Sequence, residues 1–180
     1  MYNNTSALKK IINQHITLET DRLKIRPLSL KELIGINIKK YDNLRTEIEK
    51  EALITSTKNA IAKKIVKMEN INERLHVWYT YWLIIDKETD KGIGFIGFKG
   101  IPDEKGYVEV GYSISPSHRR KGLMTEALRA MEKWTCSKKD CKGIIAYALK
   151  SNLGSHKVLI NCGFKDSSAD EYIRAYILKF

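Results

Sequence analysis

The stretch HRRKGLM, residues 118–124, lies between a strand-like run and a helix-like run of the sequence. The run before it, YVEVGYSI at 107–114, is rich in β-branched and aromatic residues, which favour strands. After it, apolar residues recur every three or four positions and so share one helical face, at Leu123, Ala127, Met131 and Trp134. A strand that passes directly into a helix through this turn is the feature from which the rest of the fold can be worked out.

The turn itself has the composition of an anion site. A helix start presents amide hydrogens without intrahelical partners and the positive end of the helix dipole. Gly122 has no Cβ to obstruct an approaching phosphate, and the basic residues before it add positive charge. The pattern therefore predicts a site for a diphosphate, while a solvated basic turn remains open as the alternative from these residues alone.

Outward from this turn, the periods of the apolar residues predict a mixed α/β arrangement in a single domain, residues 1–180. The expected order is strand, two helices, three strands, helix, strand, helix and two strands. The expected helices span 30–49, 56–74, 121–136 and 152–162. The expected strands span 20–28, 76–86, 91–101, 107–114, 144–150, 164–169 and 171–180.

Composition and charge limit the classes of protein. With 43% hydrophobic and 29% charged residues, and no apolar stretch near the ~18 residues of a membrane span, we expect a soluble protein. The N-terminus has no apolar block of the secretory type, so we expect a cytoplasmic location. The net charge of +11 favours a polyanionic partner such as nucleic acid, a ribosome or a phosphorylated cofactor.

Cysteines and histidines do not suggest a metal site. The three cysteines have neither zinc nor redox spacing, so we expect reduced thiols. The sequence therefore predicts no bound metal, because the histidines show no ligand spacing either. They are His15, His76, His118 and His156.

In this turn the chain resembles the GNAT superfamily of acyl-CoA-dependent N-acetyltransferases, whose signature is Q/R-x-x-G-x-G/A at a strand-to-helix junction. RRKGLM (119–124) fits it except at Met124, where the family has a small residue. KGLMTEAL resembles the branch that acetylates the N-terminal alanine or serine of ribosomal proteins. Further stretches resemble the first, third and fourth strands and the late helix of the family: LETDRLKIRPL (18–28), GIGFIGF (92–98), VEVGYSISP (108–116) and SNLGSHKVLINCGF (151–164).

The resemblance implies a fold and a cofactor site. The fold would be a mixed, mostly antiparallel central sheet of six to seven strands with about four helices. Acetyl-CoA would be the co-substrate, with Asn152 and Ser155 near its pantetheine arm and the backbone of Tyr112 and Ile114 bonded to that arm where two strands splay apart. Its pyrophosphate would lie on the amides of the signature turn, at Arg119, Arg120, Lys121, Gly122, Leu123 and Met124.

The resemblance also implies catalytic roles. Glu109 would be the general base, although an ordinary ion-paired glutamate remains open. Many members have a tyrosine acid seven residues after the helix-start asparagine, but Leu159 stands there. Ser155 would then donate to the departing thiolate, and the backbone amide of Tyr112 would polarise the thioester carbonyl. For Asn152, a simple N-cap role remains open as well.

The predicted function is acetyl transfer from acetyl-CoA to a primary amine, either a protein N-terminus or a small amine such as an antibiotic, a polyamine or an amino-acid derivative. A non-catalytic acyl-CoA-binding regulatory protein is a further alternative, because the tyrosine acid is missing. An RNA-binding module would explain the charge but lacks a motif. Association with the ribosome remains open, no membrane partner is expected, and a monomer or a homodimer fits.

Overall fold

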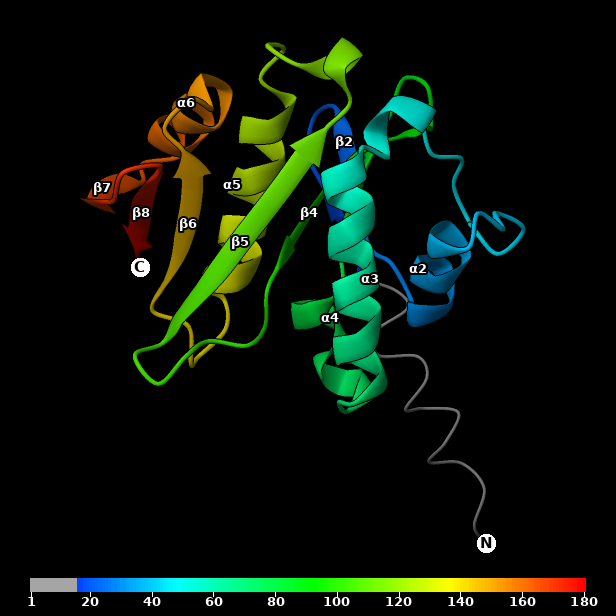
Figure 1. Ribbon diagram of the computed structural model, residues 1–180, viewed down its shortest axis with the longest axis horizontal. Coiled ribbons are helices and arrows are strands. Elements are labelled where there is room, and N and C mark those ends of the chain that lie inside the picture. Colours follow the sequence, from blue (N-terminus) through cyan, green and yellow to red (C-terminus); the bar gives the residue numbers. More distant parts are fainter. Residues whose placement is uncertain (1–15) are drawn as a thin grey trace, which may run out of the picture.

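One eight-stranded sheet runs through residues 16–180, the part of the chain that the computed structural model describes (Figure 1). Its strands lie side by side in the order β1-β2-β3-β4-β5-β6-β8-β7. Neighbouring strands are antiparallel except β5 and β6, which run parallel. The strands are β1 (Leu18–Glu19), β2 (Leu23–Pro27), β3 (Trp82–Asp86), β4 (Gly92–Phe98), β5 (Tyr107–Ile114), β6 (Gly143–Leu149), β7 (Lys165–Ala169) and β8 (Ile173–Lys179).

The expected mixed, mostly antiparallel sheet is confirmed, with eight strands where the sequence predicts six to seven. The additional strand, β1, pairs with β2 through Leu18 and Glu19 alone. Two residues are too few to display the alternation by which a strand is recognised, so β1 has no signature in the sequence.

Helices cover both faces of the sheet. In Figure 1, α3 crosses the face nearer the viewer with α2 beside it, and α5 lies behind the sheet. The helix predicted over 56–74 is α3, which ends at Glu69. Residues 16–180 contain five α-helices, where about four are expected: α2 (Leu30–Asn37), α3 (Thr55–Glu69), α4 (His76–Tyr79), α5 (Leu123–Cys136) and α6 (Leu153–Asn161). Single turns of 3-10 helix form η1 (Lys50–Ala52), η2 (Glu73–Leu75) and η3 (Pro116–His118).

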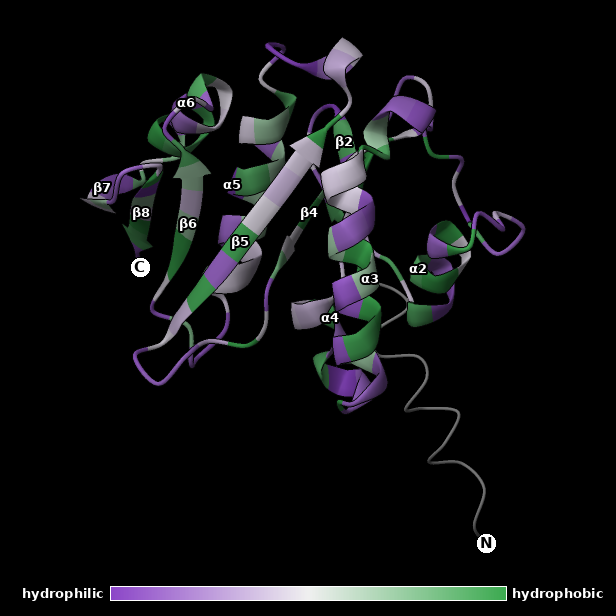
Figure 2. Cartoon of the chain, in the orientation of Figure 1, coloured by the Kyte–Doolittle hydropathy of each residue, from purple (hydrophilic) through white to green (hydrophobic). Residues whose placement is uncertain are grey.

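The sheet separates two hydrophobic layers because successive side chains of a strand point to opposite faces. On β3, Trp82 and Ile84 belong to the layer shared with α5 and α6, whereas Leu83 and Ile85 belong to the layer shared with α2 and α3. The helix α3 is amphipathic, as its bands of green and purple indicate (Figure 2), and it buries Ile61, Ile65 and Met68.

The helix predicted over 30–49 is wrong beyond Asn37, where α2 ends. Lys39 adopts a left-handed conformation with a φ of 59°, and the amide of Lys40 donates to the carbonyl of Gly35 at 2.8 Å, which closes the helix. Of the apolar residues beyond Asn37 whose spacing suggests a helix, Leu44 packs against this core layer from an irregular segment, whereas Ile38 and Tyr41 are exposed.

The strand predicted over 76–86 begins only at Trp82, because the four residues of α4 form a helical turn instead. The ring of Trp78 packs against that of Trp134 in α5, with centroids 4.8 Å apart. The indole of Trp82 donates to the carbonyl of Val77 at 2.9 Å. These tertiary contacts outweigh the strand preference of the aromatic residues.

Within residues 16–180, no helix combines the length and the apolar composition needed to cross a bilayer. His15 and the N-terminal stretch on which the expected location rests lie outside the described residues.

A buried lysine joins α3 to the sheet. The ammonium of Lys64 donates to the carbonyls of Tyr79, Thr80 and Phe98 at 2.8, 3.2 and 2.6 Å. It also lies over the ring of Tyr81, 4.6 Å from the centroid. Burial, together with the charges of Lys67 and Lys99, lowers the pKa of Lys64 to about 7. The side chain thus satisfies three carbonyls at the cost of desolvating its charge.

Lys64→Met should lower the free energy of unfolding by about 2 kcal/mol, because it leaves buried carbonyls without a donor. Since the pKa of Lys64 is lower in the folded chain than its unfolded value of 10.5, the unfolded chain binds more protons between pH 7 and 10.5. The wild type should therefore gain stability relative to the variant as pH rises through this window. Urea unfolding at several pH values measures both effects, and a difference independent of pH would contradict the second.

Candidate active site

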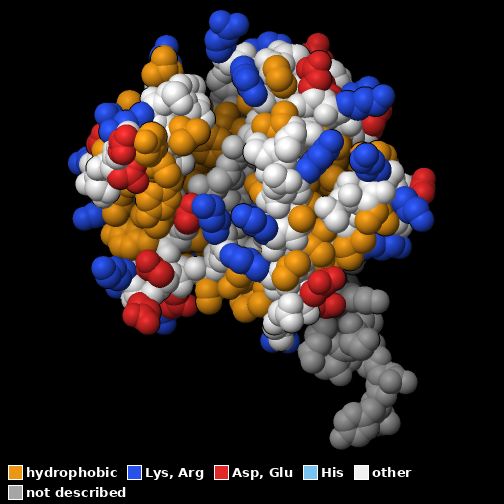
Figure 3. Space-filling model, in the orientation of Figure 1, with side chains coloured by type: hydrophobic (Ala, Val, Ile, Leu, Met, Phe, Trp, Pro, Cys, Tyr) orange, Lys and Arg blue, Asp and Glu red, His pale blue; other side chains and the backbone are white. Residues whose placement is uncertain are grey.

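The parallel strands β5 and β6 stay together only at their beginnings. Their pairing runs from Tyr107 with Gly143 to Glu109 with Ile145 and then stops, although both strands continue. Figure 1 shows the two arrows diverging beyond this point, and the space-filling surface is hollowed between their upper ends (Figure 3). The divergence leaves a gap in the middle of the sheet.

Backbone groups of β5 face this gap. The carbonyl of Glu109 accepts from Lys99 at 2.9 Å, and the amide of Ser115 donates to Ile93 at 2.8 Å, so these two odd-numbered residues direct their backbone groups toward β4. Because the direction alternates along a strand, the even-numbered residues beyond Glu109 direct theirs into the gap. These residues are Val110, Tyr112 and Ile114.

The signature turn lies beyond the end of β5, at the start of α5. Arg120 and Gly122 both have positive φ, 61° and 78°. Gly122 is the N-cap residue of α5, and no side chain caps the helix there. The first intrahelical bond recorded is from the amide of Glu126 to the carbonyl of Gly122. The amides at the helix start are thus available to an anion.

Side chains of this turn divide into two groups. Leu123 and Met124 are buried in the core, so Met124, which departs from the family pattern, does not obstruct the turn. The basic side chains before Gly122 are exposed beside the helix start, at Arg119, Arg120 and Lys121.

One long-range brace holds the turn from the side of β2. The guanidinium of Arg22 pairs with the carboxylate of Glu126 at 2.6 Å and donates to the carbonyl of Lys121 at 3.0 Å. Thr20 and the amide of Arg22 also donate to Glu126. Burial would raise the pKa of Glu126, but the hydrogen bonds from Thr20 and Arg22 outweigh it and lower this pKa.

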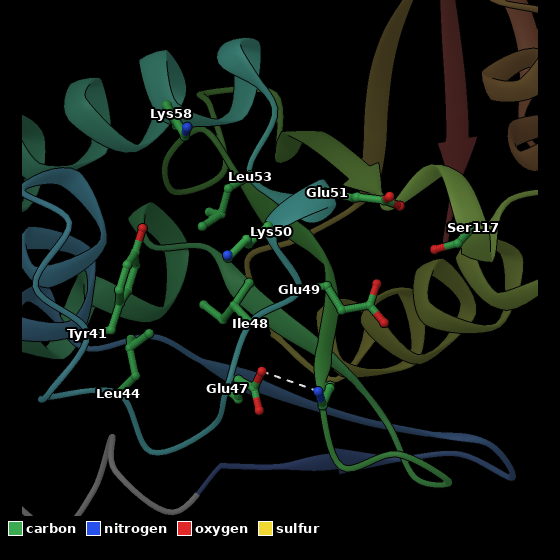
Figure 4. Close-up of a pocket in the computed structure, with 11 residues that line it drawn as sticks. Tyr41, Leu44, Glu47, Ile48, Glu49, Lys50, Glu51, Leu53, Lys58 and Ser117 are labelled. Carbon is green, nitrogen blue, oxygen red and sulfur yellow. Dashed lines mark hydrogen bonds and ion pairs between the residues drawn. The ribbon is translucent and has the colours of Figure 1, made fainter.

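A second brace comes from the segment before α3. His118 bonds to Glu49 at 2.9 Å, and Ser115 donates to Glu51 at 3.4 Å. Both glutamates line an open cavity of about 1070 Å³ on this side of the turn (Figure 4). Glu47, which also lines it, pairs with Lys91 at 3.2 Å. The carboxylates of this cavity are therefore already engaged by groups of the chain itself.

Glu109 lies at the last paired position of β5, where the gap begins. One oxygen of its carboxylate, Oε1, forms an ion pair with Lys99, and the side chain is 23% exposed. The carboxylate of Glu109 is thus ion-paired, and its catalytic role stays a prediction.

Ser155 lies close to Tyr112, on the other wall of the gap. The phenol oxygen of Tyr112 is 2.8 Å from the Oγ of Ser155. The side chain of Asn152 accepts from the amide of Ser155 at 3.1 Å and so caps α6, as one of the two interpretations of this residue requires. Contact of Asn152 with pantetheine stays a prediction.

The candidate catalytic residues approach the gap from two faces. Side chains alternate along β5, so Glu109 points to the face of α3 and Tyr112 to the face of α5 and α6. Sequence reasoning assigned Tyr112 only a backbone role and did not find Arg22, Glu126 or Lys99. Each of these makes its contact through the tertiary fold, and the Arg22–Glu126 pair spans 104 residues.

Among the described residues, no three His, Cys, Asp or Glu side chains gather in a way that could hold a metal ion.

Comparison with known proteins agrees with the geometry. The family model of the acetyltransferase (GNAT) domain matches residues 22–165, which are most of the chain. Two curated relatives are uncharacterised N-acetyltransferases: YjdG of Bacillus subtilis (strain 168), 40% identical over 83 residues, and p20 of Bacillus licheniformis, 29% identical over 161 residues. The first match covers 46% of this chain and 49% of YjdG, about half of each, and the second covers 88% of both chains.

A solved structure shares the fold. The ribosomal-protein-S5-alanine acetyltransferase from Vibrio fischeri superimposes with a TM-score of 0.65 at 18% identity, over 91% of this chain and 96% of that one. The resemblance that the sequence predicts is confirmed at the level of the fold and of the domain.

Glu126→Gln should lower the free energy of unfolding by about 1 kcal/mol at pH 7, because it weakens the partly exposed brace to Arg22. Since the pKa of Glu126 is lowered in the folded chain, its contribution is present above about pH 4.5 and is lost as pH falls further. Unfolding curves at neutral and acidic pH measure this.

Glu132→Gln, on the same helix, is the matched control, because burial raises the pKa of Glu132 despite nearby Arg129 and Lys133. It should not reproduce the acid-dependent loss. Equal pH profiles of the two variants would contradict the brace.

Proposed function

The chain belongs to the acetyltransferase (GNAT) family, and on this premise we propose that it transfers the acetyl group of acetyl-CoA to the amine at a protein N-terminus. Membership confirms the predicted enzyme class, an N-acetyltransferase that uses acetyl-CoA. The single observation that carries the proposal is the gap between β5 and β6. The turn at the start of α5, which could bind an anion, lies at its end, and the carboxylate of Glu109 and the hydroxyl of Ser155 lie beside it.

Acetyl-CoA would be held mainly by backbone. The amides at the start of α5 would bind the pyrophosphate, and the groups of β5 that face the gap would pair with the amides of pantetheine as a neighbouring strand would. Basic side chains at the turn would add long-range attraction for the phosphates: Arg119, Arg120 and Lys121.

The chemistry would use groups on both walls of the gap. Glu109 would accept the amine proton, directly or through water, as nitrogen bonds to the carbonyl carbon. The amide of Tyr112 would donate to the carbonyl oxygen. When the C–S bond breaks, its electron pair stays on sulfur, and the hydroxyl of Ser155 would donate to this thiolate. Solvent then protonates the sulfur and takes the proton from Glu109.

Two observations support a protein acceptor. The fold neighbour from Vibrio fischeri is a ribosomal-protein acetyltransferase by name. The chain carries a net charge of +11, and Lys and Arg side chains are spread over the face that contains the gap (Figure 3). Such a surface suits docking on a polyanionic assembly such as a ribosome.

The function is tested by thiol release from acetyl-CoA with a panel of peptides and small amines. Wild type should acetylate peptide N-termini in preference to polyamines or amino acids, and Glu109→Gln should lower kcat about 100-fold. Glu88→Gln, in the exposed turn after β3, is the control and should leave kcat unchanged. Preference for a small amine would overturn the acceptor assignment, and a normal rate in Glu109→Gln would remove Glu109 as the base.

The cofactor site is tested by calorimetry with CoA. Gly122→Asp should weaken CoA binding about tenfold or more, because it adds a side chain and a negative charge at the helix start. Gly163→Asp is the matched control. Gly163 also has a positive φ, 82°, but it follows the C-terminal end of α6 and not the start of a helix. Equal affinity in the two variants would contradict the phosphate site.

A further inference from the structure

The hydroxyl of Ser155 has a hydrogen-bond partner that is far from it in the sequence. Tyr112 and Ser155 are 43 positions apart, on β5 and α6, and their hydroxyl oxygens are 2.8 Å apart. Within residues 16–180 the phenol of Tyr112 is the hydrogen-bond partner of the Ser155 hydroxyl, and the phenol also donates to the carbonyl of Ser155 at the longer distance of 3.4 Å. The contact joins the two walls of the gap at the level where the strands no longer pair.

The direction of this hydrogen bond follows from acidity. A phenol is a more acidic O–H than an alkyl hydroxyl, so it is the better donor of the two. Burial raises the pKa of Tyr112 to about 12, although the bond to Ser155 acts in the opposite direction. The phenol therefore keeps its proton at neutral pH. With Ser155 Oγ as acceptor, the proton of Ser155 is left to point elsewhere.

Ser155 is also fixed through its backbone, because its amide donates to the side chain of the N-cap residue Asn152 at 3.1 Å. A serine in a helix commonly turns its hydroxyl back to a carbonyl of the preceding turn. Here the phenol engages the hydroxyl oxygen instead. Leu159, at the position where many family members have a tyrosine, is fully buried and brings no hydroxyl.

We propose that Tyr112 is a positioning residue whose phenol donates to Ser155 and thereby aims the serine proton at the sulfur of the leaving thiolate. The inference rests on the proposed function of the gap. Tyr112 itself transfers no proton: the C–N bond forms, the C–S bond breaks with its electrons on sulfur, and the polarised hydroxyl of Ser155 stabilises that charge. Tyr112, on strand β5, thus supports Ser155 in a chain that has Leu159 where many family members have a tyrosine acid.

The test compares Tyr112→Phe, Ser155→Ala and the double variant. Tyr112→Phe should lower kcat about tenfold, the loss expected for one hydrogen bond, with little change in KM for acetyl-CoA. Because Tyr112 acts through Ser155, the double variant should be no slower than Ser155→Ala. Two results would overturn the inference and leave the proposed function intact. One is a loss of kcat in the double variant that equals the product of the two single losses. The other is a wild-type kcat in Tyr112→Phe when Ser155→Ala is slow.

Tyr176→Phe is the matched control. Tyr176 is a buried tyrosine whose phenol bonds to the same helix at a different residue, to the Nδ1 of His156 at 2.8 Å. The variant should lose stability as Tyr112→Phe does and keep the wild-type kcat. If both tyrosine variants slow the reaction equally, the effect is structural and the positioning role is wrong.

A second measurement does not depend on turnover. In the complex with CoA, a donor aimed at sulfur lowers the pKa of the bound thiol, which ultraviolet absorbance of the thiolate reports. Tyr112→Phe and Ser155→Ala should both raise this pKa, and Tyr176→Phe should not. An unchanged thiol pKa would overturn the inference even if acetyl transfer occurs, whereas failure of wild type to acetylate any amine would count against the proposed function alone.

Discussion

The divergence of two parallel strands is the constraint on which the rest of the site depends. Strands β5 and β6 share hydrogen bonds only as far as Glu109 and Ile145, yet each keeps an antiparallel neighbour on its other side, β4 and β8. The sheet therefore stays continuous while its centre opens. An open strand edge is normally a liability, because its unpaired amides and carbonyls can pair with another chain. Inside a gap, the same groups become a template for an amide-containing ligand.

The turn at the end of β5 is held by contacts from distant parts of the chain. Arg22 and Glu126 fasten it to the beginning of the sheet, and Glu49 fastens it through His118 to the segment before α3. This matters because the turn carries three like charges on exposed side chains, which repel one another. The hydrogen bond from Arg22 to the carbonyl of Lys121 holds the turn in place against that repulsion, and no side chain caps the helix start.

The two faces of the sheet contribute chemically different groups at the gap. Glu109, paired with Lys99, lies on the face of α3, whereas the hydroxyls of Tyr112 and Ser155 lie on the face of α5 and α6. Alternation along one strand thus separates a group that could accept a proton from groups that could donate a hydrogen bond. A carboxylate in direct contact with the donor hydroxyls would instead accept their hydrogen bonds and cancel their effect.

The sequence by itself determined the class of fold, the signature turn and the family, because these depend on local periods and on residues that are neighbours in the chain. Seven of the eight strands are predicted from it. Two predictions are wrong, a helix that continues to residue 49 and a strand at the residues of α4, since apolar spacing does not reveal which core layer a residue joins. Only the tertiary structure decided that Tyr112 meets Ser155 and that Arg22 meets Glu126, because such contacts are made between elements and leave no local pattern. Hydrogen bonds between residues 43 and 104 positions apart exist only once the sheet has brought their strands and helices together.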